Sequence, residues 1–231
     1  MQFFYSENID NDFIILKGEE MNHCTKSLRK KIGDLICVID GSGGCYSCKI
    51  ININLKICKL LIINKKIIEK KNKVHLFIAP TKNHKRIEWM LEKIVEIGVD
   101  RITFLICENS IRKTVNLKRL NKIALSAMKQ TQNYFLPIID DCLSFKDAFD
   151  IIESKAKYIA HLCYDNIPLL SKSINNNNAK CIFIGPEGDF TNNEVSYALK
   201  HNFIEVSLGK SRLRTETSGI VSTIILNLDN E

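Results

Sequence analysis

Long apolar runs, proline and glycine are all scarce in this chain, and each scarcity narrows what the protein can be. The sequence has 231 residues, of which 4 are Pro and 10 are Gly. Every apolar stretch is shorter than the roughly 20 residues that a membrane-spanning helix needs. The N-terminus, MQFFYSENIDNDF, has neither the basic start nor the apolar segment of a signal peptide. We therefore expect a soluble, cytoplasmic protein that does not act at a membrane.

Disulfide and metal motifs are also missing, although cysteine itself is not. The 9 Cys are an odd number, and they lie in apolar runs such as LICVID and CIFIG. This is typical of buried, reduced thiols in the cytosol. Cys45-Tyr-Ser-Cys48 is one isolated C-x-x-C motif, and a structural zinc site would need a second pair of ligands. We therefore predict neither a disulfide framework nor a metal centre.

Positive charge is unevenly distributed along the chain. Residues 1–134 carry 24 Lys/Arg and 13 Asp/Glu, whereas residues 135–231 carry 9 and 13. A basic first part followed by a mildly acidic last part favours docking of a polyanion on the first. The alternative is compositional drift, because the chain is rich in Ile, Lys and Asn and has an Asn homopolymer at 175–178. Charge alone leaves both interpretations open.

Residues 1–72 are predicted to form a small β-domain. Short apolar segments are separated by turn signals, above all Asp40-Gly41-Ser42-Gly43-Gly44, which is typical of a hairpin. Helical periodicity is weak here, so we predict a β-barrel or a sandwich. The predicted strands are FIILKG, DLICVID, CYSCKIININ and KICKLLIINKKII. The polar sequence KKNK at 70–73 is interpreted as a linker.

Residues 73–231 alternate between strand and helix patterns, which indicates an α/β domain with a parallel sheet. A first helix is predicted between a cap at Asn83 and Gly98. Its apolar face consists of Ile87, Met90, Leu91, Ile94 and Ile97. Further helices are predicted near 117–132, 145–155, 191–201 and 217–228, and strands at 74–79, 101–107, 158–163, 181–185 and 204–209.

The loop Gly185-Pro186-Glu187-Gly188 stands at the end of a predicted strand. Ligands of open α/β sheets bind beyond the carboxyl ends of the strands. Gly185 and Gly188 permit backbone conformations and close ligand approaches that a Cβ would block, and a capping box at Thr191 and Glu194 starts the next helix. The alternative is an ordinary connection rich in turn residues. The loop matches neither the Walker motif nor G-x-G-x-x-G.

Two other strand ends carry polar groups. One is His161-Leu162, and the other is Leu208-Gly209, which is followed by KSRLRTETSG. Positive charge just before a helix opposes the helix dipole, so Arg212 and Arg214 are poorly explained by helix stability. They indicate the wall of a pocket for an anionic partner, or alternatively a solvated loop.

These motifs, taken together, resemble the ribosomal RNA small subunit methyltransferase E family, whose members are 16S rRNA (uracil-N3) methyltransferases of the SPOUT class. The resemblance rests on the Gly185–Gly188 loop, on Leu208-Gly209 and on Arg212-Leu-Arg-Thr-Glu-Thr217. It extends in order over nearly the whole chain. Weaker matches are His23 with Leu28-Arg29, Asp40-Gly41, Arg86-Ile-Glu-Trp89 through Glu96-Ile-Gly98, and Ala127-Met-Lys-Gln130. Asp189 and Ser218-Gly219 depart from the family pattern, in which Gly and Ala are usual.

The resemblance implies a SPOUT α/β knot, a deep trefoil with a parallel sheet flanked by helices, over residues 73–231. It implies a PUA-like β-barrel that binds RNA over residues 1–72. The implied cofactor is S-adenosylmethionine, and the implied assembly is a homodimer in which helix 217–228 is a candidate interface or, equally, core. The implied cofactor-binding residues are His161, Leu162, Gly185, Pro186, Glu187, Gly188, Leu208, Gly209, Leu213 and Thr215.

The implied reaction is methylation of N3 of a uridine in 16S rRNA. Arg214 is expected to stabilise the uracil anion, and Glu216, or less favourably Glu187, to take the proton or to hold Arg214 in place. The expected RNA-binding residues are His23, Arg29, Lys30, Lys31, Lys82, Lys85, Arg86, Arg112 and Arg212. The substrate is expected within the small ribosomal subunit. Alternatives are ribose 2′-O methylation, a non-catalytic RNA-binding assembly factor, and an unrelated nucleotide-binding α/β enzyme.

Overall fold

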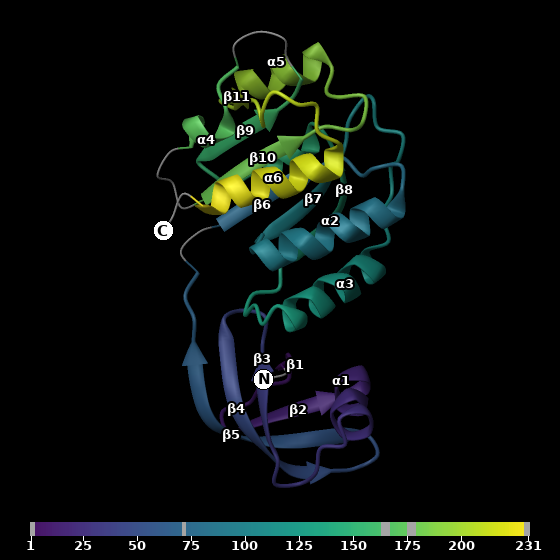
Figure 1. Cartoon of the computed structure of the whole chain (residues 1–231), viewed down its shortest axis with the longest axis vertical. Helices are drawn as coiled ribbons and strands as arrows, with labels where there is room; N and C mark the ends of the chain where they lie inside the picture. Colours follow the sequence, from purple (N-terminus) through teal and green to yellow (C-terminus); the bar gives the residue numbers. More distant parts are fainter. Residues whose placement is uncertain (1–2, 71–72, 163–166, 175–178, 229–231) are drawn as a thin grey trace. The chain divides into compact units, whose positions relative to one another are not determined.

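The structure, a computed structural model, describes residues 3–70, 73–162, 167–174 and 179–228 (Figure 1). The chain divides into two compact units, one of residues 1–70 with 125–136 and one of residues 71–124 with 137–231. The predicted boundary between residues 72 and 73 stays a prediction, and part of the predicted linker, residues 71–72, lies outside the described residues. In the described part, no helix is both long enough and apolar enough to cross a membrane.

The first unit is built on a five-stranded sheet in the order β1-β3-β4-β5-β2. Its strands β4 and β5 are long and strongly curved, which gives the sheet a curled shape (Figure 1). The four predicted strands are present, and a fifth, at the N-terminus, escaped prediction. The bounds are β1 (Phe3–Tyr5), β2 (Phe13–Lys17), β3 (Leu35–Ile39), β4 (Gly44–Ile53) and β5 (Ile57–Ile67). Two short helical turns, α1 (Gly18–Asn22) and η1 (His23–Ser27), were not predicted.

Buried and exposed side chains alternate along β4, so one face of this sheet packs on the core of the unit and the other faces solvent. Tyr46, Cys48 and Ile50 are buried in the core of the unit, whereas Ser47 and Lys49 between them are exposed. The predicted hairpin joins β3 to β4 in antiparallel pairing. Its turn is closed by the Asp40 carboxylate, whose Oδ1 accepts hydrogen bonds from the backbone N–H of Ser42 (2.7 Å) and Gly44 (2.9 Å).

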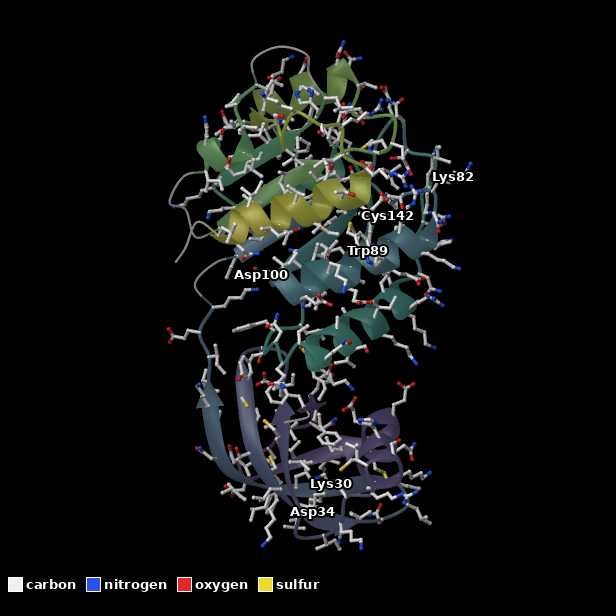
Figure 2. All side chains as sticks on the ribbon, viewed as in Figure 1. Lys30, Asp34, Lys82, Trp89, Asp100 and Cys142 are labelled. Atoms are coloured by element: carbon white, nitrogen blue, oxygen red, sulfur yellow. The ribbon has the colours of Figure 1, made fainter. Side chains whose placement is uncertain are left out.

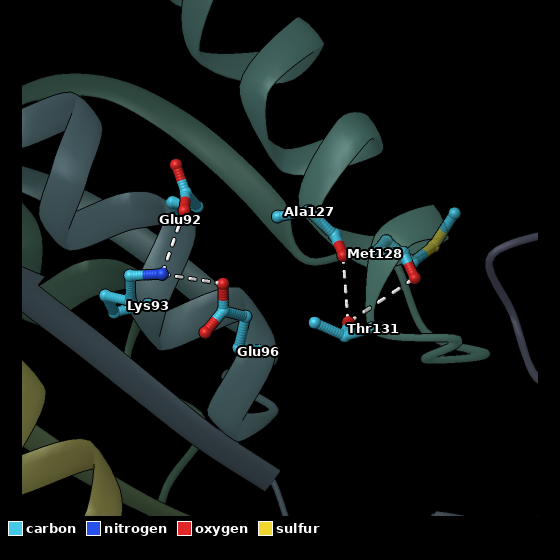
Figure 3. A network of polar contacts seen from close by, with 6 residues as sticks. All are labelled: Glu92, Lys93, Glu96, Ala127, Met128 and Thr131. Carbon is cyan, nitrogen blue, oxygen red and sulfur yellow. Dashed lines mark hydrogen bonds and ion pairs between the residues drawn. The ribbon is translucent and has the colours of Figure 1, made fainter.

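The segment 125–136 completes the first unit. Gly43 N donates to the carbonyl oxygen of Tyr134 (3.1 Å), and Leu136 N donates to that of Gly41 (2.8 Å). Thr131 Oγ1 donates to the carbonyl oxygen of Ala127 (2.8 Å) just where helix α3 (Leu117–Gln130) ends (Figure 3). The Ala127–Gln130 motif is therefore the last turn of this helix. The residues that follow it make the two backbone hydrogen bonds to the β3–β4 turn.

The eight cysteines that the structure describes are free, and six of them are buried, as predicted. The two members of the C-x-x-C motif have different partners. Cys45 Sγ lies 3.3 Å from Cys37 Sγ, whereas Cys48 is buried in the core and its Sγ lies 3.6 Å from the carbonyl oxygen of Tyr46. Burial raises the pKa of the Cys48 thiol to about 12, so it remains protonated at neutral pH.

The second unit contains a six-stranded parallel sheet in the order β11-β9-β10-β6-β7-β8. The strands are β6 (Lys73–Ile78), β7 (Arg101–Ile106), β8 (Ile138–Ser144), β9 (Ala156–Ala160), β10 (Ala179–Ile184) and β11 (Ile204–Val206). The helices besides α3 are α2 (His84–Ile97), η2 (Asp147–Ile151), α4 (Leu170–Ser173), α5 (Asn192–Lys200) and α6 (Thr215–Leu228). The predicted fold class, an α/β domain with a parallel sheet and an N-terminal PUA-like β-unit, is confirmed; the knot stays a prediction.

One predicted element is wrong. The helix predicted at 145–155 is only a short 3₁₀ turn, η2, and the residues before it form the strand β8, which was not predicted. The sequence of β8 is IIDDCLS, in which two adjacent acids hide the strand pattern. Tertiary packing explains the difference. Phe145 and Ala148 are buried against the sheet, and this packing holds the segment close to β8, so a regular helix does not form.

Helices cover both faces of the parallel sheet. Helices α2 and α6 lie side by side on one face (Figure 1), where Gly219 of α6 sits so close to Ile78 and Met90 that a Cβ would come within 3.0 Å of both. Figure 3 shows Lys93 of α2 bridging Glu92 (2.8 Å) and Glu96 (2.9 Å) on the helix surface. The opposite face carries an aromatic cluster of Phe77, Phe145, Phe183, Phe190 and Phe203 under η2 and α5.

Candidate active site

A cavity of about 440 Å³ opens at the carboxyl ends of β9, β10 and β11. It is walled by the three segments that the sequence marked at strand ends, as expected for an open α/β sheet. The predicted cofactor-binding residues that line it are His161, Leu162, Gly185, Pro186, Glu187, Leu208, Gly209, Leu213 and Thr215. Gly188, the tenth, is exposed and is not part of the lining. The ligand roles of these residues stay predictions.

The two glycines of the Gly185–Gly188 loop are explained by the protein's own packing. Neither has a positive φ, so the expected special backbone conformation is absent at both. A Cβ on Gly185 would lie 3.2 Å from the ring and the backbone nitrogen of Phe190, and one on Gly188 would lie 3.1 Å from Cβ of Asn109. Gly185 also accepts a hydrogen bond at its carbonyl oxygen from Thr215 Oγ1 (3.1 Å). The loop is thus fixed from both sides, by helix α6 and by Phe190.

The left-handed backbone occurs instead at Asp189, where φ is 62°. This is the position at which the sequence departs from the glycine of the family pattern, and Asp is among the few residues that tolerate this conformation. Its carboxylate has a partner across the cavity rim: Oδ2 accepts a hydrogen bond from Leu162 N (2.7 Å). Asn109 Nδ2 holds the adjacent carbonyl oxygens of Gly188 (3.2 Å) and Asp189 (3.0 Å). Asp189 therefore ties the end of β9 to the loop after β10.

Replacing Asp189 by alanine is expected to lower the free energy of unfolding of the second unit by about 1–3 kcal/mol. The change removes a hydrogen-bond acceptor. It also places alanine, which has no polar side chain to stabilise this conformation, in the left-handed region. Asp189→Asn is the matched control, because Asn keeps an acceptor oxygen and tolerates the same φ. Urea unfolding of both variants measures the difference. Equal losses for the two variants would contradict the described role.

The third wall is the segment between β11 and α6. Gly209 has a φ of 139°, a conformation that a side chain rarely adopts. Both arginines that precede α6 line the cavity and are exposed to solvent. Arg212 also donates a long hydrogen bond from Nη2 to the carbonyl oxygen of Glu187 (3.4 Å). The cavity therefore has a cationic rim on this side.

The two predicted carboxylates lie in different surroundings from those expected. Glu216 does not line the cavity; it is buried, and its Oε1 lies 3.5 Å from Nε of Arg86, so its recorded ion pair is with Arg86 and not with Arg214. Glu187 lines the cavity, but its Oε1 accepts a hydrogen bond from Lys82 N (3.0 Å). Glu216 is therefore withdrawn from the cavity, whereas Glu187 stays in its wall with one carboxylate oxygen bound to the backbone of Lys82.

The predicted RNA-binding residues are spread over both units. His23 lies on η1, and Arg29, Lys30 and Lys31 follow it on the connection to β3. In the second unit, Lys82 and Lys85 are exposed near the start of α2, where Figure 2 labels Lys82. Arg112 donates to the carbonyl oxygens of Thr81 (3.0 Å) and Lys82 (2.6 Å), so it fixes that loop. Arg86 and Arg212 differ from these residues, because both line the cavity.

Several cavity residues escaped prediction: Ala160, Ile184, Asp189, Ser207, Ser211 and Ser218. Asp189 was noted only as a departure from the family pattern, and Arg86 was assigned to RNA. The available signal for Arg86 was its position in the first turn of α2, where a cation is unfavourable for the helix.

Comparisons with known proteins agree with this geometry. Residues 69–227 match a family described as RNA methyltransferase domain, and residues 16–63 match an RNA methyltransferase PUA domain. A ribosomal RNA small subunit methyltransferase E from Buchnera aphidicola is 30% identical, covering 97% of this chain and 92% of that protein. The crystal structure of a probable rRNA-methyltransferase from Porphyromonas gingivalis is 35% identical with a TM-score of 0.89, over 96% and 95% of the two chains.

A further solved structure carries a ligand. A ribosomal RNA small subunit methyltransferase E from Neisseria gonorrhoeae, bound to S-adenosyl methionine, is 25% identical with a TM-score of 0.86 and covers 99% of this chain and 97% of its own. Family match, full-length relatives and fold point the same way. The chain belongs to the ribosomal RNA small subunit methyltransferase E family of RNA methyltransferases.

Proposed function

We propose that this protein transfers a methyl group from S-adenosylmethionine to N3 of a specific uridine in 16S ribosomal RNA. The observation that carries the proposal is the single cavity into which the three marked strand ends converge, with cationic side chains on its rim. Membership of the family supports it, and so does the S-adenosyl methionine in the Neisseria relative.

The residues present fit this methyl donor. The cavity, about 440 Å³, falls within the range of about 300–1,000 Å³ that is usual for small-ligand sites. Leu162, Leu208 and Leu213 offer apolar contacts, while the backbone around Gly185 and Gly209 offers peptide groups for an adenine or an amino acid moiety. Nε2 of His161 is buried at the cavity wall, 3.7 Å from Oε1 of Glu205, and has no hydrogen-bond partner among the described residues. The bound donor supplies an electrophilic methyl group on a sulfonium.

The protein's own contribution is orientation and charge. N3 of uracil must lose its proton before it attacks, and the resulting negative charge spreads over the ring oxygens. Guanidinium groups held at the cavity rim would stabilise that charge, and such preorganised groups are often the largest catalytic term. Arg212 and Arg214 are placed on this rim. Glu216 is poorly placed to act as the base, because it is buried and paired with a cation, which lowers the basicity of a carboxylate.

The assembly belongs to the same proposal. We infer a homodimer in the cytoplasm, with the last part of the chain threaded as a knot, acting on 16S rRNA within the small subunit. Apolar side chains on α2 and α6 support the dimer: Trp89 (labelled in Figure 2), Ile224 and Leu228 are 49%, 37% and 65% exposed. His23 of η1 and the basic residues Arg29, Lys30 and Lys31 that follow it in the first unit would supply phosphate contacts. Sedimentation of the purified protein tests the dimer directly.

Methyl transfer to candidate RNAs tests the substrate. The protein is incubated with labelled S-adenosylmethionine and, separately, with small subunits that lack 3-methyluridine, with their extracted 16S RNA, and with large subunits. The proposal expects label in the small-subunit RNA and none in the large. Label in large-subunit RNA, or bound donor without any transfer, would contradict it.

A further inference from the structure

Arg86 is the one predicted RNA-binding residue of the α2 start that lines the cavity. It lies in the first turn of α2, where the helix has no acidic residue and where Asn83 already caps the backbone by accepting from Lys85 N (2.9 Å). A cation at this end opposes the helix dipole. Helix stability therefore does not explain Arg86, and neither does solvation alone, since its side chain is 40% exposed beside a buried acid.

That acid is Glu216, whose position accounts for how Arg86 is held. The Glu216 side chain is 7% exposed, and its Oε1 lies 3.5 Å from Nε of Arg86. Its Oε2 is buried without a hydrogen-bond partner among the described residues. A buried carboxylate depends on a nearby cation. The pair joins two helices that are 130 residues apart in sequence, and it restricts the side chain of Arg86 to the wall of the cavity.

Among the described residues, neither of the other two cavity arginines pairs with a carboxylate. Arg212 and Arg214 are both exposed on the segment before α6, and Arg212 donates to a backbone carbonyl oxygen, that of Glu187 (3.4 Å). Stabilisation of a developing charge is most effective when the donors are fixed beforehand, because no reorganisation is then needed. Arg86 meets this criterion through its pairing with a buried carboxylate, a partner that the other two lack among the described residues.

We propose that Arg86 is a catalytic residue that contacts the target base and stabilises its negative charge, and that Glu216 is a positioning residue for Arg86. This inference rests on the proposed function. N3 of the uracil ring loses its proton to solvent, and its electron pair forms the new N–C bond while the bond from that carbon to the donor sulfur breaks. The guanidinium of Arg86 faces the ring oxygen that carries the charge of the deprotonated base.

The test measures kcat against pH for the wild type and for Arg86→Met, with small subunits as substrate and mapped 3-methyluridine as product. We expect kcat to fall by about 100-fold at neutral pH. A cation close to an acidic group lowers its pKa by about 1–3 units, so the rising limb of the variant's profile should move upward by about one pH unit. The affinity for S-adenosylmethionine, measured by calorimetry, should change by less than about threefold, because the contact is to the base and not to the donor.

Two further variants keep the test independent of folding. Arg86→Met leaves a buried carboxylate without its cation, which is destabilising, so Arg86→Met/Glu216→Gln removes both charges. It should show the same shift of the pH profile, and Glu216→Gln alone a smaller one. Lys155→Met is the matched control, since Lys155 is exposed at the amino end of β9, at the opposite edge of the sheet; its profile should match the wild type.

Three results would overturn the inference, and they differ from one another. An unshifted pH profile with reduced kcat would assign Arg86 a purely structural role. A tenfold or larger loss of donor affinity would assign Arg86 to the donor's carboxylate. If the wild-type protein binds the donor but forms no 3-methyluridine, the proposed function itself fails, and this inference fails with it.

Discussion

Replacing Gly185 by valine is expected to weaken the binding of S-adenosylmethionine by about 100-fold, equivalent to about 2.7 kcal/mol. Gly185 is buried at the end of β10 and lines the cavity. A Cβ alone would already come within 3.2 Å of Phe190 and its backbone nitrogen, and the two methyl groups of valine would need further space. Valine must therefore displace Phe190 or the loop backbone, which Thr215 also holds at the carbonyl oxygen of residue 185, and a shift of this loop changes the wall of the cavity. Calorimetric titration with the donor measures the loss.

Gly188→Val separates this effect from general damage to the loop. Gly188 is exposed and lies outside the cavity lining, and a Cβ there would come as close to its neighbour, 3.1 Å from Cβ of Asn109, as one on Gly185 would come to Phe190. Its donor affinity should fall by less than about fivefold, or 1 kcal/mol. Circular dichroism confirms that both variants fold. Equal affinities for Gly185→Val and the wild type would show that the donor binds elsewhere.

Acid is expected to destabilise the second unit well above the pH at which carboxylates titrate. His75 of β6 is buried, stacks on Phe77 with ring centroids 3.8 Å apart, and hydrogen bonds through Nε2 to Thr103 Oγ1 (2.8 Å). Thr103 and Arg101 both bond to the Asp140 carboxylate. Burial, helped by the positive charge of Arg101, lowers the pKa of His75 to about 3. The ring is therefore kept neutral in the folded protein.

The sign follows from proton binding. The unfolded chain protonates this histidine below pH 6.5, whereas the folded chain does so only near pH 3. Between these values the unfolded state binds more protons, so the stability from His75 is complete above pH 6.5 and is lost as the pH falls. The loss approaches about 1.4 kcal/mol per pH unit. From pH 6.5 to 4.5 the wild type should lose about 2 kcal/mol through this group.

His75→Gln is expected to reduce that acid sensitivity by about 2 kcal/mol over the same interval, whatever it costs at neutral pH. Urea unfolding followed by tryptophan fluorescence reports on the correct unit, since the chain's 1 Trp, Trp89, lies on α2. His84→Gln is the control, because His84 is exposed at the start of α2. Asp140 does not interfere: burial raises its pKa, but hydrogen bonds from Arg101 and Thr103 outweigh burial and lower it below 3.8. An unchanged acid slope in His75→Gln would refute the argument.

Local signals account for the parts of the fold that could be predicted. Asn83 and Gly98 bound α2 as expected, and Thr191 with Glu194 forms the predicted capping box of α5. Each of these depends on residues a few positions apart. The strand β8 and the turn η2 could not be found in this way, because their conformation follows from burial of Phe145 and Ala148 against a sheet formed by distant segments.

The candidate site shows the same contrast between features that local sequence predicts and contacts that depend on distant segments. The convergence of three loops was predictable, because parallel strands present their carboxyl ends at one edge, and the resemblance named the loops. The contacts between them were not predictable. Leu162 with Asp189 and Arg86 with Glu216 are pairs of residues far apart in sequence, and only the folded chain shows which of several acids meets which cation or amide. This is why Glu216 was expected beside Arg214 and lies beside Arg86.

The identity of the methylated atom tests the central claim most directly. RNA labelled by the protein in small subunits is digested to nucleosides, and the labelled product is separated and identified by mass spectrometry. The account predicts a single product, 3-methyluridine, from one position of the 16S RNA. Label recovered on a ribose 2′ oxygen would leave the fold and the donor site intact and would contradict the proposed chemistry, including the role of Arg86.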